Sequence, residues 1–140
     1  MDSVKRVLVL CTGNSCRSQM AEGWLRHFAD TRAEIFSAGI VASGLNPKAV
    51  AVMKESGIDI SRHASKTVEM LPEKEFDFVI TVCDNAKEHC PYFPATTKLL
   101  HRNFEDPTYA LGTPEEILDA YRATRDLLKE YCKRFVDEIL

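Results

Sequence analysis

Residues 4–30 read VKRVLVLCTGNSCRSQMAEGWLRHFAD, and this stretch decides the fold. Its first part, Val4 to Leu10, is a nearly continuous Val/Leu run, which is typical of a strand buried on both faces of a parallel sheet. From Ser18 to Asp30, apolar residues recur at helical spacing, and Ser18 is placed to open the helix. A strand, a tight turn and a helix are the opening unit of an α/β fold.

The turn between this strand and this helix has the composition of an oxyanion site. It consists of Cys11, Thr12, Gly13, Asn14, Ser15, Cys16, Arg17 and Ser18. Backbone N–H groups that curl together at a helix N-terminus bind a tetrahedral oxyanion, and Gly13 and Asn14 tolerate the positive φ that such a curl needs. Arg17 offers a planar fork to two oxyanion oxygens. We therefore expect residues 12–18 to bind an oxyanion; the Gly-Lys-Ser/Thr ending of a nucleotide-binding loop is absent.

Cys11 lies at the base of this expected site. The amides, the helix dipole and Arg17 all favour a thiolate, so we expect the pKa of Cys11 to lie below the ordinary thiol value and Cys11 to act as a nucleophile. Ser18 either donates a hydrogen bond to that thiolate or only caps the helix.

The rest of the chain alternates in the same way. Further strands are expected at Ile35–Ala38, Phe76–Val82 and Lys98–Arg102, and further helices from Asn46-Pro47 to Gly57 and from Thr113 onward. The pattern predicts one domain, residues 1–140, with a parallel sheet covered by helices on both faces. Cys11, Cys83 and Asp106 each follow a predicted strand, so one end of the sheet should collect all three.

Composition and charge exclude several functions. Eighteen basic against twenty-one acidic residues leave a net charge of -3 with no dense basic cluster, which argues against binding to nucleic acid or to an anionic membrane. The first apolar run is too short for a signal peptide or a membrane span, so we expect a cytoplasmic protein. Five cysteines in such a chain favour reactive thiols over a disulfide framework.

At the level of motifs, the chain resembles the thioredoxin-coupled arsenate reductases, which share the fold of the low-molecular-weight protein tyrosine phosphatases. The matching stretches are residues 11–24 (CTGNSCRSQMAEGW), Ser37-Ala38-Gly39-Ile40, Gly44-Leu45-Asn46-Pro47, Met53-Lys54-Glu55, Gly57-Ile58-Asp59-Ile60-Ser61 and Phe104-Glu105-Asp106-Pro107. The resemblance implies a four-stranded parallel sheet with flavodoxin-like layering and reduction of arsenate to arsenite.

The resemblance also assigns roles to residues. It places the general acid at Asp106, although Asp-Pro alone could be only a turn. Reduction needs two electrons from thiols, and Cys83 and Cys90 match the family's second and third redox cysteines at their usual spacing. The implied relay runs from Cys11 to Cys83 to Cys90, with thioredoxin or a similar dithiol protein as external reductant, no tightly bound cofactor, and a monomer as the expected state.

Three alternatives stay open. A low-molecular-weight protein tyrosine phosphatase is the first, with Gln19 against it because those phosphatases usually have proline there; weak phosphatase activity is compatible with either function. A zinc module of Cys83, His89, Cys90 and His101 is the second, and it lacks a paired C-x2-C knuckle. Structural cysteines are the third, and we assign that role to Cys16 and Cys132.

A potassium site is the last feature that the resemblance raises. Some family members bind potassium through residues matching Asn14, Glu22 and Ser37 plus an aspartate. This chain has Lys66 in place of that aspartate. The lysine argues against the ion, and its ammonium group could take the place of the ion.

Overall fold

The structure, a computed structural model, describes residues 4–73 and 75–140. The strands are β1 (Lys5–Cys11), β2 (Ala33–Gly39), β3 (Phe78–Thr81) and β4 (Lys98–His101), and they form one parallel sheet in the order β2-β1-β3-β4. The helices are α1 (Arg17–Ala29), α2 (Pro47–Glu55), α3 (Asp84–Glu88) and α4 (Pro114–Glu138). Short 3₁₀ turns are η1 (Asp30–Arg32), η2 (Val68–Met70) and η3 (Pro107–Tyr109). The expected four-stranded parallel sheet is confirmed.

Strand β1 lies in the middle of the sheet, as its apolar run predicted. Val7, Leu8, Val9 and Leu10 are fully buried, and β1 pairs with β2 on one side and with β3 on the other. Leu10 is in register with Thr81, and the Val82 amide donates to the Leu10 carbonyl at 3.0 Å. The carboxyl ends of β1 and β3 are therefore adjacent, which brings the residues after them to one edge of the sheet.

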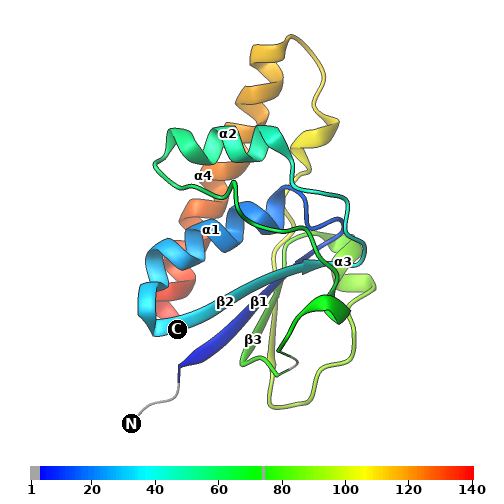
Figure 1. Cartoon of the computed structure of the whole chain (residues 1–140), viewed down its shortest axis with the longest axis vertical. Helices are drawn as coiled ribbons and strands as arrows, with labels where there is room; N and C mark the ends of the chain where they lie inside the picture. The colour runs from blue at the N-terminus through cyan, green and yellow to red at the C-terminus, as the bar shows by residue number, and fades with distance from the viewer. Residues whose placement is uncertain (1–3, 74) are drawn as a thin grey trace.

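Helices cover both faces of this sheet. Helices α1 and α4 pack together on one side, where Phe78 of β3 meets Phe135 of α4 with ring centroids 5.3 Å apart, and α2 packs against both helices. Figure 1 shows this helical layer on one side of the sheet, with residues 65–73 and the connection from β3 to β4 on the other. That second side is closed by an aromatic chain, Phe36 to Phe76 to Phe93, and by the short helix α3, which contacts β1 and β3.

The helix boundaries have local causes. Asn46 caps α2 with its side chain, which accepts from the Lys48 and Ala49 amides, and Pro47 opens the helix. Thr113 and Glu116 form a capping box at the start of α4. None of the helices in residues 4–73 and 75–140 is long and apolar enough to cross a bilayer.

Two expectations about local structure were wrong. Phe76 does not belong to a strand, because its ring fills the aromatic cluster on the second face while pairing starts at Phe78. Residues Asp84–Glu88, for which no helix was expected from the sequence, form a helical turn. The turn forms because Cys83 caps it, with its sulfur accepting from the Ala86 amide, and because Ala86 is buried.

Candidate active site

The oxyanion loop, residues 11–18, is held from beneath by one buried side chain. Asn14 is fully buried with φ 47°, and its Nδ2 donates to the Ser18 and Ser37 hydroxyls at 2.9 Å each. Its Oδ1 accepts from Gln19 Nε2 at 3.0 Å and from the Lys66 amide at 2.9 Å. Asn14 thus uses its full hydrogen-bonding capacity to fix the curl of the loop.

Gly13 is needed in the loop for its small size and not for the positive φ that was expected. Its φ is not positive, so conformational freedom is not the reason for a glycine. A Cβ at this position would lie 2.6 Å from Ser43 Oγ, inside van der Waals contact. Gly13 therefore allows the segment containing Ser43 to approach the loop.

Ser18 does not cap helix α1. The helix begins at Arg17, and its N-cap, Cys16, makes no side-chain capping bond. The Ser18 hydroxyl instead accepts from Asn14, while the Ser18 amide donates to the Cys11 sulfur and lowers the pKa of Cys11. Of the two roles considered for Ser18, capping is wrong, because Ser18 is already the second residue of the helix.

A cavity of about 230 Å³ lies above the loop and contains the expected oxyanion chemistry. Cys11, Arg17 and Asp106 line it together. Its other lining residues are Thr12, Gly13, Ser15, Cys16, Ser43 and Thr108. Ser43 and Thr108 had no signal in the sequence, because neither lies in the loop motif.

Hydrogen bonds to Phe104 and Thr108 orient the Arg17 and Asp106 side chains. Arg17 is 8% exposed; its Nη1 donates to the Phe104 carbonyl at 2.9 Å, and its Nη2 lies 3.4 Å from Asp106 Oδ2. Asp106 Oδ1 accepts from the Thr108 amide at 3.0 Å and from the Thr108 hydroxyl at 2.7 Å. Asp106 can serve both as a turn residue and as a general acid, because it caps η3 and also lines the cavity.

Cys11 and Cys83 are hydrogen-bonded to each other at the end of β1 and β3. The Cys83 sulfur also lies 3.3 Å from the Thr12 hydroxyl and 3.4 Å from the Ala86 amide. Both cysteines are nearly inaccessible to solvent. Two residues 72 positions apart thus form one thiol pair beside the oxyanion loop.

The pair changes the expected ionisation of Cys11. Cys83 and burial raise the pKa of Cys11 above the ordinary value, outweighing Arg17 and the Ser18 amide, which lower it. The hydrogen bonds from Cys11, Thr12 and Ala86 hold the pKa of Cys83 below the ordinary value. The expectation of a low pKa at Cys11 is therefore not met in the reduced pair, in which the two thiols titrate together.

The other three cysteines lie apart from this pair. Cys90 is half-buried beside a separate cavity, and burial raises its pKa. Burial and the nearby Asp106 raise the pKa of Cys16 to about 12, which makes it a poor nucleophile although it lines the site. Cys132 is completely buried, with its thiol donating to the Ala21 carbonyl at 3.8 Å, and burial raises its pKa.

The residues that match the family's potassium site do not fit a potassium ion, as Lys66 suggested. Ser37 donates to Glu22 Oε1 at 2.6 Å, and Asn14 presents its NH₂ group, not its oxygen, to Ser37. Arg26 and the Lys66 ammonium already neutralise Glu22, at 2.9 Å and 3.8 Å. An additional cation would meet two positive charges and N–H donors in place of oxygen ligands.

The four residues considered as a zinc module, Cys83, His89, Cys90 and His101, do not form a metal site among the described residues. Within residues 4–73 and 75–140, no three His, Cys, Asp or Glu side chains are close enough together to hold a metal ion. His101 lies near Cys90, but its two ring nitrogens contact Thr81 and Asp84. Its nitrogens are therefore engaged within the protein.

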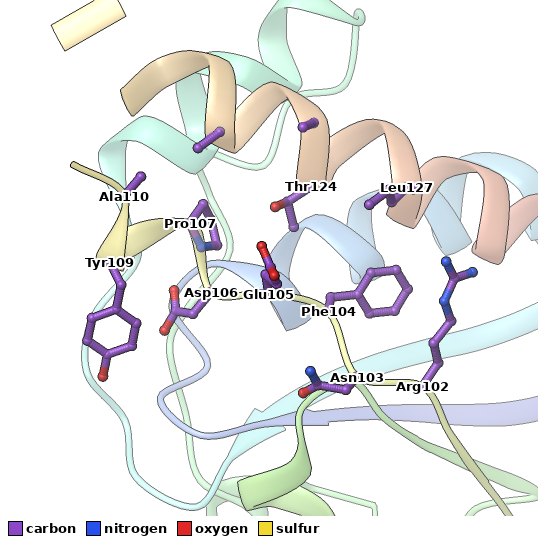
Figure 2. A pocket seen from close by; sticks show the side chains of 12 residues that line it. Arg102, Asn103, Phe104, Glu105, Asp106, Pro107, Tyr109, Ala110, Thr124 and Leu127 are labelled. Atoms are coloured by element: carbon purple, nitrogen blue, oxygen red, sulfur yellow. The ribbon is translucent and has the colours of Figure 1, made fainter. Parts of the chain in front are cut away.

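A second, larger cavity is also lined by Asp106, but it contains none of the residues of the oxyanion loop. It has a volume of about 590 Å³ between α4 and residues 102–110. Figure 2 shows Glu105 and Asp106 on the segment along one side of this cavity, with Thr124 and Leu127 of α4 opposite. It contains no cysteine, so its size does not make it the reaction site.

Comparisons with known proteins agree with this geometry. The family model described as low molecular weight phosphotyrosine protein phosphatase matches residues 6–140. The arsenate reductase of Bacillus licheniformis is 45% identical over 135 residues, covering 96% of this chain and 97% of the relative, and that of Halalkalibacterium halodurans is 44% identical over 133 residues, covering 95% and 96%.

Solved structures give the same picture. An arsenate reductase in its oxidized state superposes with a TM-score of 0.83 at 29% identity, covering 97% of this chain and 99% of the other. A low molecular weight protein tyrosine phosphatase from T. tengcongensis superposes with a TM-score of 0.80 at 30% identity, covering 96% and 99%.

Proposed function

This chain belongs to the low molecular weight phosphotyrosine protein phosphatase family, and within it we propose that the protein reduces arsenate to arsenite. The relatives at about 44% identity are arsenate reductases over almost their whole length. The observation that carries the proposal is the hydrogen-bonded Cys11–Cys83 pair beside an oxyanion cavity that also holds Arg17 and Asp106. A hydrolytic phosphatase needs one of these thiols; a reductase needs both.

Arsenate binds in the oxyanion loop. The loop amides and the Arg17 guanidinium neutralise its oxygens. A proton moves from Cys11 to Cys83 within the pair, and the Cys11 thiolate attacks arsenic. Asp106 protonates the departing oxygen, which leaves as water. The product is a Cys11–arsenic(V) adduct.

Cys83 completes the reduction. After its proton is lost, the Cys83 thiolate attacks the Cys11 sulfur, an S–S bond forms and the S–As bond breaks. The electron pair of that bond stays on arsenic, which leaves as arsenite in the +3 state. Two thiols are oxidised for one arsenic reduced, so the electrons balance.

Cys90 carries the disulfide outward. Its thiolate attacks Cys83, releases Cys11 as a thiolate and forms a Cys83–Cys90 disulfide in the redox segment, residues 83–90. This transfer requires the segment to rearrange until the two Cα atoms lie within about 7 Å. An external dithiol protein such as thioredoxin then reduces the disulfide.

Mass mapping of disulfides after one arsenate turnover tests this proposal. The wild type should accumulate the Cys83–Cys90 disulfide, and the Cys90→Ser variant should stop at Cys11–Cys83. Cys132→Ser is the matched control, because that cysteine is buried away from the site. Steady thioredoxin-driven turnover by Cys90→Ser would show that the relay does not exist.

Phosphatase activity is a second candidate, favoured by the complete Cys11, Arg17 and Asp106 set. We expect it to be weak, because Cys83 holds the pKa of Cys11 high in the resting pair. Gln19, at the position where the phosphatases have proline, donates to the Asn14 and Ala64 carbonyls, so it belongs to the support of the loop. Comparing arsenate-dependent NADPH oxidation, coupled through thioredoxin and its reductase, with p-nitrophenyl phosphate hydrolysis separates the two activities.

We further propose that residues 1–140 act as one domain, as a monomer in the cytoplasm. The odd number of cysteines, five, argues against a disulfide framework and supports a reducing compartment. A monomer is compatible with the chemistry, since every residue used in the proposed steps comes from one chain. Sedimentation of the reduced protein measures the oligomeric state.

A further inference from the structure

Within the part of the chain that the structure describes, the redox segment has polar contacts to the rest of the fold at Cys83 and at one further residue, Asp84. Among residues 4–73 and 75–140, every recorded hydrogen bond or ion pair between positions 84–90 and the chain outside positions 83–90 involves Asp84. The Asp84 amide donates to Asn103 Oδ1 at 3.0 Å, and Asp84 Oδ1 accepts from His101 Nε2 at 2.8 Å. The residue that follows Cys83 is therefore clamped to the end of β4 and the residues after it.

His101 is itself well fixed on the sheet. Its Nδ1 lies 2.7 Å from the Thr81 hydroxyl, which is buried at the end of β3. Because Thr81 is in register with both Leu10 and His101, the imidazole is anchored to the strand that precedes Cys83. His101 thus connects a rigid strand end to the first residue of α3.

The far end of the segment makes no such contact with the other described residues. The His89 ring contacts only the Asn85 carbonyl of its own turn, at 2.9 Å, and the Cys90 amide contacts the Lys87 carbonyl. A cavity of about 300 Å³, lined by Thr81, Lys87, Cys90, Leu99, Leu100 and His101, lies between this end and β4. The buried Ala86 and the half-buried Cys90 supply the apolar contacts. One end of α3 is therefore fixed and the other is poorly packed.

We propose that His101 is a positioning residue of the arsenate reduction: its contact with Asp84 keeps the Cys83 sulfur directed at Cys11 for the first disulfide, and breaking this contact releases α3 for the second. The inference rests on the proposed function. Asp84 is directly bonded in the chain to Cys83, so a shift of Asp84 moves the backbone that carries the sulfur. Attack on the Cys11 sulfur needs alignment with the Cys11–arsenic bond, and this alignment depends on how rigidly Cys83 is held.

The two exchanges place opposite demands on this contact. In the first, the Cys83 thiolate forms the bond to Cys11 and arsenic leaves with the electron pair, which a fixed Cys83 favours. In the second, Cys90 bonds to Cys83 and the Cys11 thiolate leaves, which requires α3 to move. Loss of the clamp should therefore slow the first exchange and leave the second unchanged or faster.

Rapid-quench mass spectrometry after mixing with arsenate, without reductant, measures the first exchange alone in a Cys90→Ser background. His101→Ala should slow formation of the Cys11–Cys83 disulfide about fivefold, the size expected for one partly exposed, charge-assisted hydrogen bond. Asp84→Ala should slow it similarly, and the double variant should be no slower than either. His101→Gln keeps an N–H group for Asp84 and should restore most of the rate.

His89→Ala is the matched control, because this histidine lies on the same segment but contacts only its own turn. Affinity for inorganic phosphate should stay at the parent value in every variant, since the oxyanion loop is untouched. In the Cys90-containing protein, the ratio of Cys83–Cys90 to Cys11–Cys83 disulfide should rise in His101→Ala.

If folded His101→Ala or Asp84→Ala formed the Cys11–Cys83 disulfide at the parent rate, the proposed clamp would be wrong. It would also be wrong if affinity for inorganic phosphate fell by the same factor as this rate, because that would indicate a general disruption of the site. Should His101→Ala fail to fold, Asp84→Ala decides the question, because the Asp84 side chain is 68% exposed. A parent protein that forms no disulfide with arsenate overturns the proposed function instead, and the role of His101 with it.

Discussion

The oxyanion loop and the redox segment lie side by side at the carboxyl end of the sheet, yet they are supported in opposite ways. The loop rests on the fully buried Asn14, whose side chain makes hydrogen bonds to Ser18, Gln19, Ser37 and the Lys66 amide. The redox segment has polar contacts to its surroundings at Asp84 and a cavity under its far end.

This difference follows from what each region has to do. A site for an oxyanion gains from rigid donors that need no reorganisation when charge arrives. A disulfide carrier must bring Cys83 first to Cys11 and then to Cys90, which a rigid helix could not do. Substitutions in the oxyanion loop should therefore change oxyanion binding and the attack on arsenic, whereas substitutions in the redox segment should change the disulfide exchanges.

The largest expected effects separate the two sulfurs of the pair. Cys11→Ser should lower the rates of arsenate reduction and p-nitrophenyl phosphate hydrolysis alike, each by about 10³-fold or more, because the other thiol that lines the cavity, Cys16, is a poor nucleophile. Cys83→Ser should abolish arsenate reduction to the same extent but keep the hydrolysis, which needs only one thiol. Both rates are measured on the same preparations; loss of hydrolysis in folded Cys83→Ser would contradict the division between the two regions.

A smaller but still large loss is expected from Arg17→Lys. Lysine keeps the charge but loses the planar fork and the contact to the Phe104 carbonyl, so kcat/KM for arsenate should fall about 100-fold. Steady-state kinetics measures the change. Arg32→Lys, on the η1 turn away from the site, serves as control and should keep the parent kcat/KM; an equal loss there would point to a nonspecific effect.

The third test concerns stability. Asn14→Ala removes a buried side chain with partners on both its groups and places alanine at φ 47°, so the free energy of unfolding should drop by about 2–4 kcal/mol. Asn85→Ala, on the exposed surface of the redox segment, should change it by less than about 0.5 kcal/mol. Urea unfolding of the reduced proteins gives both values, and equal losses would remove the distinction between the two supports.

The smallest expected effect is a shift in thiol titration. Cys83 raises the pKa of Cys11, so Cys83→Ser should lower the pKa of Cys11. The hydrogen bond from Cys11 is the largest cause that lowers the pKa of Cys83, so Cys11→Ser should raise the pKa of Cys83. The pH dependence of iodoacetamide alkylation, followed peptide by peptide, measures both shifts, and a Cys11 pKa that stays constant without Cys83 would show that the two thiols titrate independently.

Much of the fold was predictable because its signals are local. The Val/Leu run of β1, the Asn46-Pro47 start of α2 and the Thr113 cap of α4 each specify an element within a few residues. Helix α3 was missed because four of its five residues are polar and its cap is a cysteine sulfur, which no capping rule includes. Phe76 was misassigned because an aromatic next to a strand reads as strand whether it pairs or packs.

The candidate site was likewise predictable only where its signals are local. Cys11, Arg17 and Asp106 were predicted, and the structure brings them into one cavity, because strand ends and a loop motif specify them. Ser43 and Thr108 were missed, and the pKa direction of Cys11 was wrong, since both depend on contacts between distant segments. A pattern along one chain shows which thiol has a helix N-terminus near it, but it does not show that a second thiol shares its proton.

The pairing of β1 with β3 has a consequence for protein engineering. The Val82 amide and the Leu10 carbonyl hold the two strand ends together, so the second position after β3 always faces the first residue of the loop. In a hydrolase built on the same sheet, that position is the place to graft an electron donor. A cysteine there would supply the second thiol for a single turnover, and a third thiol within reach, as Cys90 is here, would still be needed to release the loop cysteine.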